Sequence, residues 1–364
     1  MTKMTEAEEC LLQVISRIVP PDEDARGKAR ARWNACAKPL GSLGLLESAV
    51  EDIAALTGSP EVNISKKCVL VLCADHGVTA QGVSQTDSSV TAAVARQLAL
   101  GRTAVCRMAV RAGCRVVPVD MGIRDFRPEE DSGKEKITDC RVGNGTEDFT
   151  KGPAMSREQA AQAVLMGIRL AEEEKRRGTG LLAVGEMGIG NTTAASALAS
   201  VFLGLPIEVV TGRGAGLSEE GVRRKIAAIR KAIEVNHPDP GDPLDVLSKV
   251  GGFELAGMCG VFLGAAACRI PALIDGFPCA AAALAATGLC PEAKQAMLAS
   301  HVSAEPGAGR VLEALGKRSL ITAGLRLGEG TGAVAAMPLL DMAAAVYSEA
   351  YTFEEGGIIP YVPQ

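Results

Sequence analysis

The sequence predicts an α/β protein in which a parallel sheet is covered by helices on both faces, a Rossmann-like three-layer arrangement. Short β-branched runs alternate along the chain with long helical patterns. That alternation is typical of parallel sheets, in which a helix usually crosses over between neighbouring strands. At 364 residues the chain is long enough to bury a large core, as one large domain or two smaller ones.

Five runs are predicted to be buried strands, and most of them end in Asp, Glu or Gly: 68–75, 114–122, 180–188, 207–214 and 269–277. Five stretches have the length and periodicity of helices: 88–111, 156–176, 192–203, 218–235 and 244–267. Ligands of such sheets bind beyond the carboxyl ends of the strands, where those polar residues and glycines fall. The polar, Gly-rich segment 123–153 is predicted to be a long surface loop.

Helical segments flank the strand-bearing region at both ends of the chain. We expect residues 1–364 to form one unit with a large α/β domain over about 60–325. Residues 1–59 and about 330–364 are expected to form a smaller helical lobe against it.

The composition excludes several classes of protein. A net charge of -5 without a Lys/Arg block argues against nucleic-acid and anionic-membrane partners. The eleven cysteines are odd in number, spread out and never spaced CxxC, which favours buried thiols in a reduced, cytoplasmic protein. The N-terminus has no signal-type apolar core, and charged residues and a proline interrupt the apolar region 255–289. Its uncharged pieces are shorter than the roughly 20 residues of a membrane span, so we expect a soluble protein.

The segment GEMGIGNTTAASALAS (185–200) follows a predicted strand and opens a predicted helix. Gly188 and Gly190 leave the loop backbone bare, and Asn191 and Thr192 are residue types that cap helices. Free N–H groups at such a helix start suit a phosphate, although an ordinary capped turn is the alternative. The segment is neither a Walker loop nor GxGxxG.

A second Gly-rich turn, TGRGAGLSEEGVRRK (211–225), ends in the basic run Arg223, Arg224 and Lys225. Such a run is usually a solvated helix face. Because a glycine loop stands just before it, a lysine reaching a phosphate is the competing interpretation.

Asp75 and His76 end another predicted strand. Such a pair can bind a metal, but the chain has three histidines and no HExxH spacing. We therefore predict no metal site, and a structural or substrate-shaping role for His76. Ser303 and Glu305 precede a Pro-Gly turn, and no GxSxG elbow supports nucleophilic catalysis.

The segment RLGEGTGAVAAMP (326–338) places Glu329 between two glycines at the mouth of an apolar helix. Glycines let a backbone approach a ligand closely, and a carboxylate at such a position can touch the ligand too. The residues alone thus indicate an α/β enzyme with a phosphate-bearing ligand and Glu329 as a candidate base. They do not identify the substrate.

Eight segments resemble, in order and across almost the whole chain, the nicotinate-nucleotide–dimethylbenzimidazole phosphoribosyltransferase family, whose members activate the lower-ligand base of cobamides. They are KPLGSLGLLE, CADHGV, GPAMSREQA, GEMGIGNTT, DVLSKVGGFELAGMCGVFLGAA, IPALIDGF, SAEPGA and LRLGEGTGAVAAMPLLDMA. The resemblance implies transfer of the 5-phosphoribosyl group of nicotinate mononucleotide to 5,6-dimethylbenzimidazole, giving α-ribazole 5′-phosphate and nicotinate. It implies a single displacement with inversion, in one phosphoribosyltransferase unit.

The resemblance also implies the roles of individual residues. Glu329 is the general base that takes the N–H proton of the incoming base, for which its pKa should rise from the reference of about 4.3. Nicotinate leaves from a cationic pyridinium, so neither a general acid, a metal nor a cofactor is needed. The remaining positions carried over to the nucleotide site are Glu186, Lys225, Ser303, Leu327 and Gly328.

The chain departs from the family pattern in the acceptor pocket. Val94 stands where known members carry a Gln that touches the benzimidazole, and Thr86 stands in place of a Ser. The acceptor therefore stays open between a benzimidazole and the phenols or purines that some relatives use. Val94 merely packing its helix is the alternative. We expect a homodimer, with a heterodimer of two similar subunits as the alternative.

Two rival classes compete with this interpretation. A non-catalytic nucleotide-binding paralogue is disfavoured because Glu329 and Glu186 are retained. A nicotinamide-dinucleotide oxidoreductase is disfavoured because the chain lacks GxGxxG and its ribose-binding acid.

Overall fold

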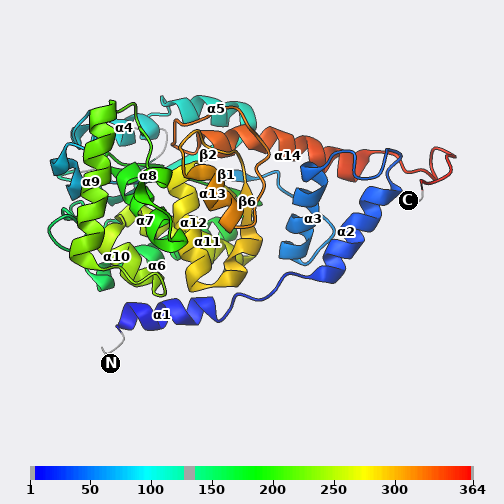
Figure 1. The fold of residues 1–364 in the computed structure, drawn as a ribbon. Coiled ribbons are helices and arrows are strands. Elements are labelled where there is room, and N and C mark those ends of the chain that lie inside the picture. Colours follow the sequence, from blue (N-terminus) through cyan, green and yellow to red (C-terminus); the bar gives the residue numbers. More distant parts are fainter. Residues whose placement is uncertain (1–4, 127–135, 362–364) are drawn as a thin grey trace.

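A six-stranded parallel sheet forms the centre of the computed structural model, which describes residues 5–126 and 136–361 (Figure 1). The strand order is β3-β2-β1-β4-β5-β6, and every neighbouring pair is parallel. The strands are β1 (Lys67–Ala74), β2 (Cys114–Gly122), β3 (Thr138–Asp139), β4 (Leu181–Met187), β5 (Ala272–Ile274) and β6 (Met297–Ala299). The predicted α/β class with a parallel sheet is confirmed.

Helices cover both faces of the sheet. They are α1 (Glu6–Ile15), α2 (Glu23–Ala35), α3 (Leu45–Thr57), α4 (Ser89–Ala99), α5 (Ala104–Ala112), α6 (Arg157–Arg176), α7 (Asn191–Leu203), α8 (Ile207–Val210), α9 (Glu219–Asn236), α10 (Pro243–Val250), α11 (Phe253–Cys268), α12 (Phe277–Leu289), α13 (Ala308–Ala314) and α14 (Thr331–Glu349), with 3₁₀ turns η1 (Gly77–Gln81) and η2 (Pro291–Ala296). Along β1, Leu70 and Leu72 join the core beneath α6, α11 and α12, while Val69 and Val71 join the core beneath α4, α5 and α14. This alternation shows that β1 is buried on both faces.

Four of the five predicted strands are present, but the strand predicted over 207–214 is wrong. Residues Ile207–Val210 form the short helix α8, and a loop follows. The run is β-branched, yet Val209 is exposed while Val210 is buried, so only part of it enters the core. Strands β3 and β6 were not predicted, because two or three residues are too few to show a period.

Two predicted helices are each divided in two by glycine. The stretch 88–111 becomes α4 and α5, separated at Gly101, where φ is +70°. The stretch 244–267 becomes α10 and α11, separated at Gly251 and Gly252. Part of the predicted surface loop, residues 127–135, lies outside the described residues. The remainder carries β3 and buries Phe149, so it is not purely a surface loop.

A helical lobe extends from the α/β layers, and the C-terminal end of the chain lies at its far side (Figure 1). It is formed by α2, α3 and the end of α14, around a small core in which the rings of Trp33 and Tyr347 lie 5.1 Å apart. Helix α1 lies elsewhere, on α6, where Glu8 pairs with Arg157 at 2.6 Å. The division into domains of 60–325 and 1–59 with 330–364 stays a prediction.

Helix α14 is the one helix within residues 5–126 and 136–361 that is long and apolar enough to cross a membrane. Half of its apolar window is buried inside the protein. Asp341 on its surface pairs with Lys67 of β1 at 2.9 Å. Helices in the core of a protein can have this length and composition. The partial burial of α14 and its ion pair with β1 match such a packed helix.

Candidate active site

A cavity of about 310 Å³ lies at the carboxyl ends of the central strands, where the loop after β4 meets the loop before α14. Most of the residues predicted for the site line it. These are Thr86, Glu186, Gly188, Gly190, Asn191, Thr192, Ser303, Leu327, Gly328 and Glu329. Two predicted residues, Lys225 and Val94, do not line it. The structure therefore assembles residues that lie far apart in sequence at one edge of the sheet.

A backbone contact brings the two predicted glutamates together. The Glu329 N–H donates a hydrogen bond to the Glu186 carbonyl oxygen at 3.1 Å, so the loop before α14 runs along the end of β4. Gly185 permits this approach, because a Cβ there would lie 2.4 Å from the Gly330 nitrogen. Gly328, Glu329 and Gly330 all have positive φ, at +89°, +59° and +84°. For a glutamate this left-handed conformation costs about 1–3 kcal/mol, so the surrounding contacts must hold it.

The Glu329 carboxyl group is half-buried at the start of α5. Burial raises its pKa above 4.5, and hydrogen bonds from Thr103 and the Val105 N–H at that helix start partly oppose the rise. Its Oε2 atom is buried and has no hydrogen-bond partner. The carboxyl group thus has one oxygen without a partner, and an unpartnered carboxylate oxygen can accept a proton.

Glu186 is in a different state. Burial, followed by repulsion from the carboxylates of Asp275, Glu254 and Glu329, raises its pKa to about 8. The Asn191 amide donates a hydrogen bond to its Oε2. At neutral pH Glu186 is therefore mostly protonated and can act as a hydrogen-bond donor.

The loop between β4 and α7 is supported from below. The Thr91 hydroxyl accepts a hydrogen bond from the Ile189 N–H at 3.2 Å and donates one to Asp75 at 2.7 Å. His76 lies against Gly190 and pairs through Nε2 with Glu254 at 2.7 Å, and both side chains are fully buried. His76 does not line the cavity, which agrees with a structural role. The described ranges contain no group of three metal-ligating side chains.

Lys225 lies behind the cavity wall instead of facing the cavity. It is fully buried, and its Nζ donates to Thr192 Oγ1 at 2.8 Å and to the Gly212 carbonyl at 3.4 Å. Burial lowers its pKa to about 8. Lys225 is therefore linked to the cavity wall by Thr192, which does line the cavity.

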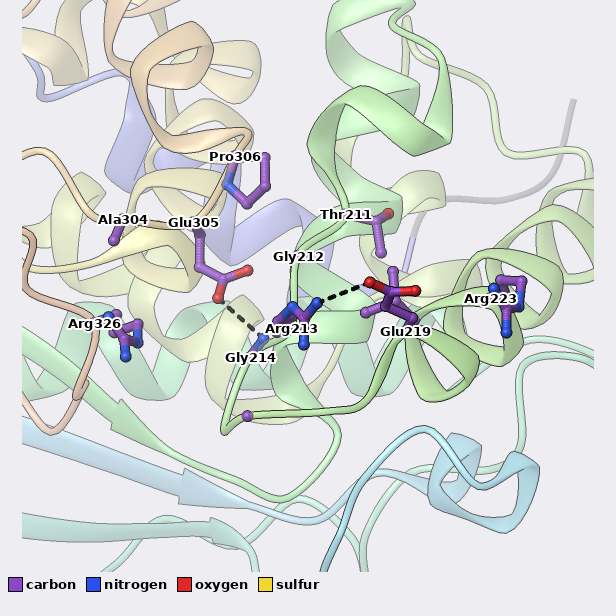
Figure 2. Close-up of a pocket in the computed structure, with 12 residues that line it drawn as sticks. Thr211, Gly212, Arg213, Gly214, Glu219, Arg223, Ala304, Glu305, Pro306 and Arg326 are labelled. Carbon is purple, nitrogen blue, oxygen red and sulfur yellow. Dashed lines mark hydrogen bonds and ion pairs between the residues drawn. The ribbon is translucent and has the colours of Figure 1, made fainter.

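Arg213 and Arg326 also line the cavity, and both side chains are exposed. Neither residue was predicted for the site from the sequence. Both also border a neighbouring cavity of about 660 Å³, together with Gly214 and Glu305 (Figure 2). Glu305 accepts a hydrogen bond from the Gly214 N–H at 3.0 Å and so shapes the wall between the two cavities. Arg213 lies in the Gly-rich motif GRGAG, and Arg326 lies in RLGEG. Membership of these motifs is the sequence signal that could have identified both residues.

The acceptor side of the cavity differs from the prediction. Val94 packs into the core beneath α4 and α5, and Val90, one turn earlier on α4, lines the cavity instead. Thr86 lines the cavity as predicted, together with Ser84. Val90 therefore adds an apolar side chain to the cavity where Val94 was expected to do so.

Comparison with known proteins assigns the family. A sequence model described as "Phosphoribosyltransferase" matches residues 18–358. A nicotinate-nucleotide–dimethylbenzimidazole phosphoribosyltransferase of Acetivibrio thermocellus is 45% identical over 97% of this chain and 99% of its own length. The chain belongs to this phosphoribosyltransferase family. The relative of the same name in Desulforudis audaxviator is 44% identical over 96% of this chain and 98% of its own length.

Solved structures of the phosphoribosyltransferase family share the fold. The crystal structure of CobT from Thermus thermophilus is 40% identical, with a TM-score of 0.87 over 93% of this chain and 100% of that chain. The resemblance expected from the eight sequence segments is confirmed, and so is the assignment to a transferase family.

Replacing Glu186 by Gln is expected to stabilise the protein most at alkaline pH. Its pKa is about 8 in the folded state against 4.5 ordinarily, so the folded state binds more protons between these values and stability falls as pH rises. Glutamine does not titrate, so the Glu186→Gln variant does not lose stability in this way as the pH rises. Thermal unfolding at about pH 5 and about pH 8.5 measures it, and the gain in Tm over the wild type should be larger at the higher pH. Glu234→Gln on the exposed face of α9 is the control, and an equal gain at both pH values for Glu186→Gln would contradict the assignment.

Proposed function

We propose that this chain transfers the 5-phosphoribosyl group of nicotinate mononucleotide to 5,6-dimethylbenzimidazole or a related base, giving α-ribazole 5′-phosphate and nicotinate. The observation that carries the proposal is that Glu329, whose Oε2 has no hydrogen-bond partner, lines the cavity beside a glycine loop and a helix start. Mixing the protein with nicotinate mononucleotide and the base, and measuring free nicotinate, tests it. No release of nicotinate from a folded protein would refute it.

Glu329 acts as the general base in this reaction. One ring nitrogen of the acceptor attacks C1′ while the bond from C1′ to the pyridinium nitrogen breaks, and its electron pair neutralises the pyridinium. The other ring nitrogen gives its proton to Glu329 Oε2. Attack opposite the leaving ring inverts C1′ once, so a β-nucleotide gives an α-product. A raised pKa makes the Glu329 carboxylate a better proton acceptor near neutrality.

The 5′-phosphate is bound where the backbone is bare and positively polarised. Gly188 and Gly190 precede α7, and Asn191 and Thr192 at the start of this helix line the cavity. Arg213 and Arg326 add two exposed cations at the same cavity, and Lys225 orients Thr192 from behind. A neutral Glu186 lets this anion bind without a further negative charge beside it.

The proposal extends to the acceptor base, the oligomeric state and the cellular location. The chain is 45% identical to a relative named for dimethylbenzimidazole, and Val90 supplies an apolar wall for such a ring. A homodimer in the cytoplasm is the expected assembly and location. In support, the eleven cysteines are free in the structure, as in proteins of a reducing compartment.

Glu329→Gln is expected to lower turnover by about 10²–10⁴-fold while nicotinate mononucleotide still binds, because a general base contributes that much. Nicotinate release at saturating acceptor measures turnover, and calorimetry measures binding. Turnover within about threefold of the wild type, with an acceptor that must lose a proton, would remove Glu329 from this role.

The dephosphorylated donor, nicotinate riboside, is expected to react with a kcat/KM at least about 10-fold lower, because it forfeits several charge-assisted hydrogen bonds. Arg326→Gln should lower kcat/KM for the nucleotide and leave that for the riboside nearly unchanged. Arg310→Gln, an exposed arginine on α13, is the control. Equal efficiency with both donors would contradict the phosphate site.

A tolerant acceptor site is expected, because an apolar wall discriminates weakly, by about 10–200-fold per methylene. Several benzimidazoles should react, and adenine or a phenol more slowly. Competition between equimolar acceptors measures the preference. Val90→Gln should change it, whereas Val94→Gln, one turn away and off the cavity, should not. Exclusive use of 5,6-dimethylbenzimidazole, unchanged by Val90→Gln, would refute the pocket argument.

A further inference from the structure

Asp275 holds the start of α14 from a distant part of the chain. It follows β5, is 2% exposed, and accepts hydrogen bonds from the Gly330 N–H at 3.1 Å and the Ala333 N–H at 2.9 Å. The N-cap residue of α14 is Gly330, which supplies no side-chain hydrogen bond. The carboxylate of Asp275 therefore takes over the capping of this helix, from 55 positions earlier in the sequence.

The residue directly before this cap is Glu329. Gly328, Glu329 and Gly330 form three consecutive left-handed positions, a conformation that a glutamate adopts only when its surroundings impose it. Two contacts fix the turn on the side of β4, namely the bond from the Glu329 N–H to Glu186 and the packing of Gly330 on Gly185. On the side of α14, the Thr331 hydroxyl donates a hydrogen bond to the Gly328 carbonyl at 2.7 Å, and the Asp275 carboxylate accepts from Gly330.

We infer that Asp275 is a positioning residue for the transfer reaction: it locks the 328–330 turn so that the Glu329 carboxylate keeps its direction into the cavity. This inference rests on the proposed function of Glu329. Asp275 itself is absent from the cavity lining, although Gly276, its neighbour, belongs to it. Its two hydrogen bonds therefore reach the cavity through the turn.

A residue that only stabilises the fold and one that aims a base have different kinetic consequences. Misdirection of a base by a fraction of an ångström lowers the rate of the chemical step and leaves binding of the nucleotide intact. This loss of rate can occur only while Glu329 is present to act as the base. Asp275 should consequently matter in the wild-type background and hardly matter once Glu329 is replaced.

The test is a double-mutant cycle of Asp275→Asn and Glu329→Gln. Asp275→Asn, which keeps the shape and one acceptor oxygen, is expected to lower kcat by about 10–100-fold, with KM for nicotinate mononucleotide within about threefold. Added to Glu329→Gln, it should lower the residual rate by less than about threefold. Asp275→Ser, a smaller capping residue, provides a second variant.

Asp242→Asn is the control, because Asp242 also caps a helix: it is the N-cap residue of α10, accepts from the Asp245 N–H at 3.2 Å, and does not line the cavity. It should leave kcat unchanged. An unchanged kcat in folded Asp275→Asn, or an equal loss in both backgrounds, would overturn the inference. So would a loss of the fold in both Asp275 variants while Asp242→Asn stays folded, because the role would then be structural. If Glu329→Gln itself keeps full turnover, the base assignment fails instead, and the two failures are thereby distinguished.

Discussion

The hydrogen bond from the Glu329 N–H to the Glu186 carbonyl joins two segments that lie more than a hundred residues apart, and the geometry of the site depends on it. It adds the loop before α14 to the end of a central strand, so that one rigid element positions both carboxyl groups. Gly185 makes the contact possible by carrying no side chain. A site attached to a sheet in this way has little freedom to drift, which is what proton transfer and in-line attack require.

Burial gives the two glutamates different chemistry. Glu186 lies among other carboxyl groups, which with burial raise its pKa to about 8, whereas the Glu329 carboxyl group lies at the start of α5, where the Thr103 hydroxyl and the Val105 N–H favour its anion. Pairs of acids whose surroundings separate their pKa values commonly divide the roles of donor and acceptor. Here the same protein interior produces a neutral hydrogen-bond donor on one side of the turn and a base on the other.

The sequence predicted the class of fold and most of the cavity, because both depend on local patterns. Glycine-rich motifs marked the 188–192 loop and Glu329, and the family resemblance added Glu186. Contacts between distant segments were beyond such reasoning, because the cap that Asp275 places on α14 depends on packing that no motif encodes. Spacing along α4 likewise does not resolve which of its valines meets the ligand. The strand wrongly expected over 207–214 has a similar origin, since β-branched residues favour a strand only where a neighbouring strand and covering layers receive them.

Helix α14 spans the molecule from the cavity to the helical lobe (Figure 1). At about 1.5 Å per residue it is a rod of roughly 28 Å, with Glu329 at one end and the contact between Tyr347 and Trp33 at the other. Pro338, inside the helix, removes one backbone hydrogen bond near its middle. Helix α14 therefore connects the packing of the helical lobe to the turn that carries Glu329, and Pro338 interrupts its hydrogen bonds between the two.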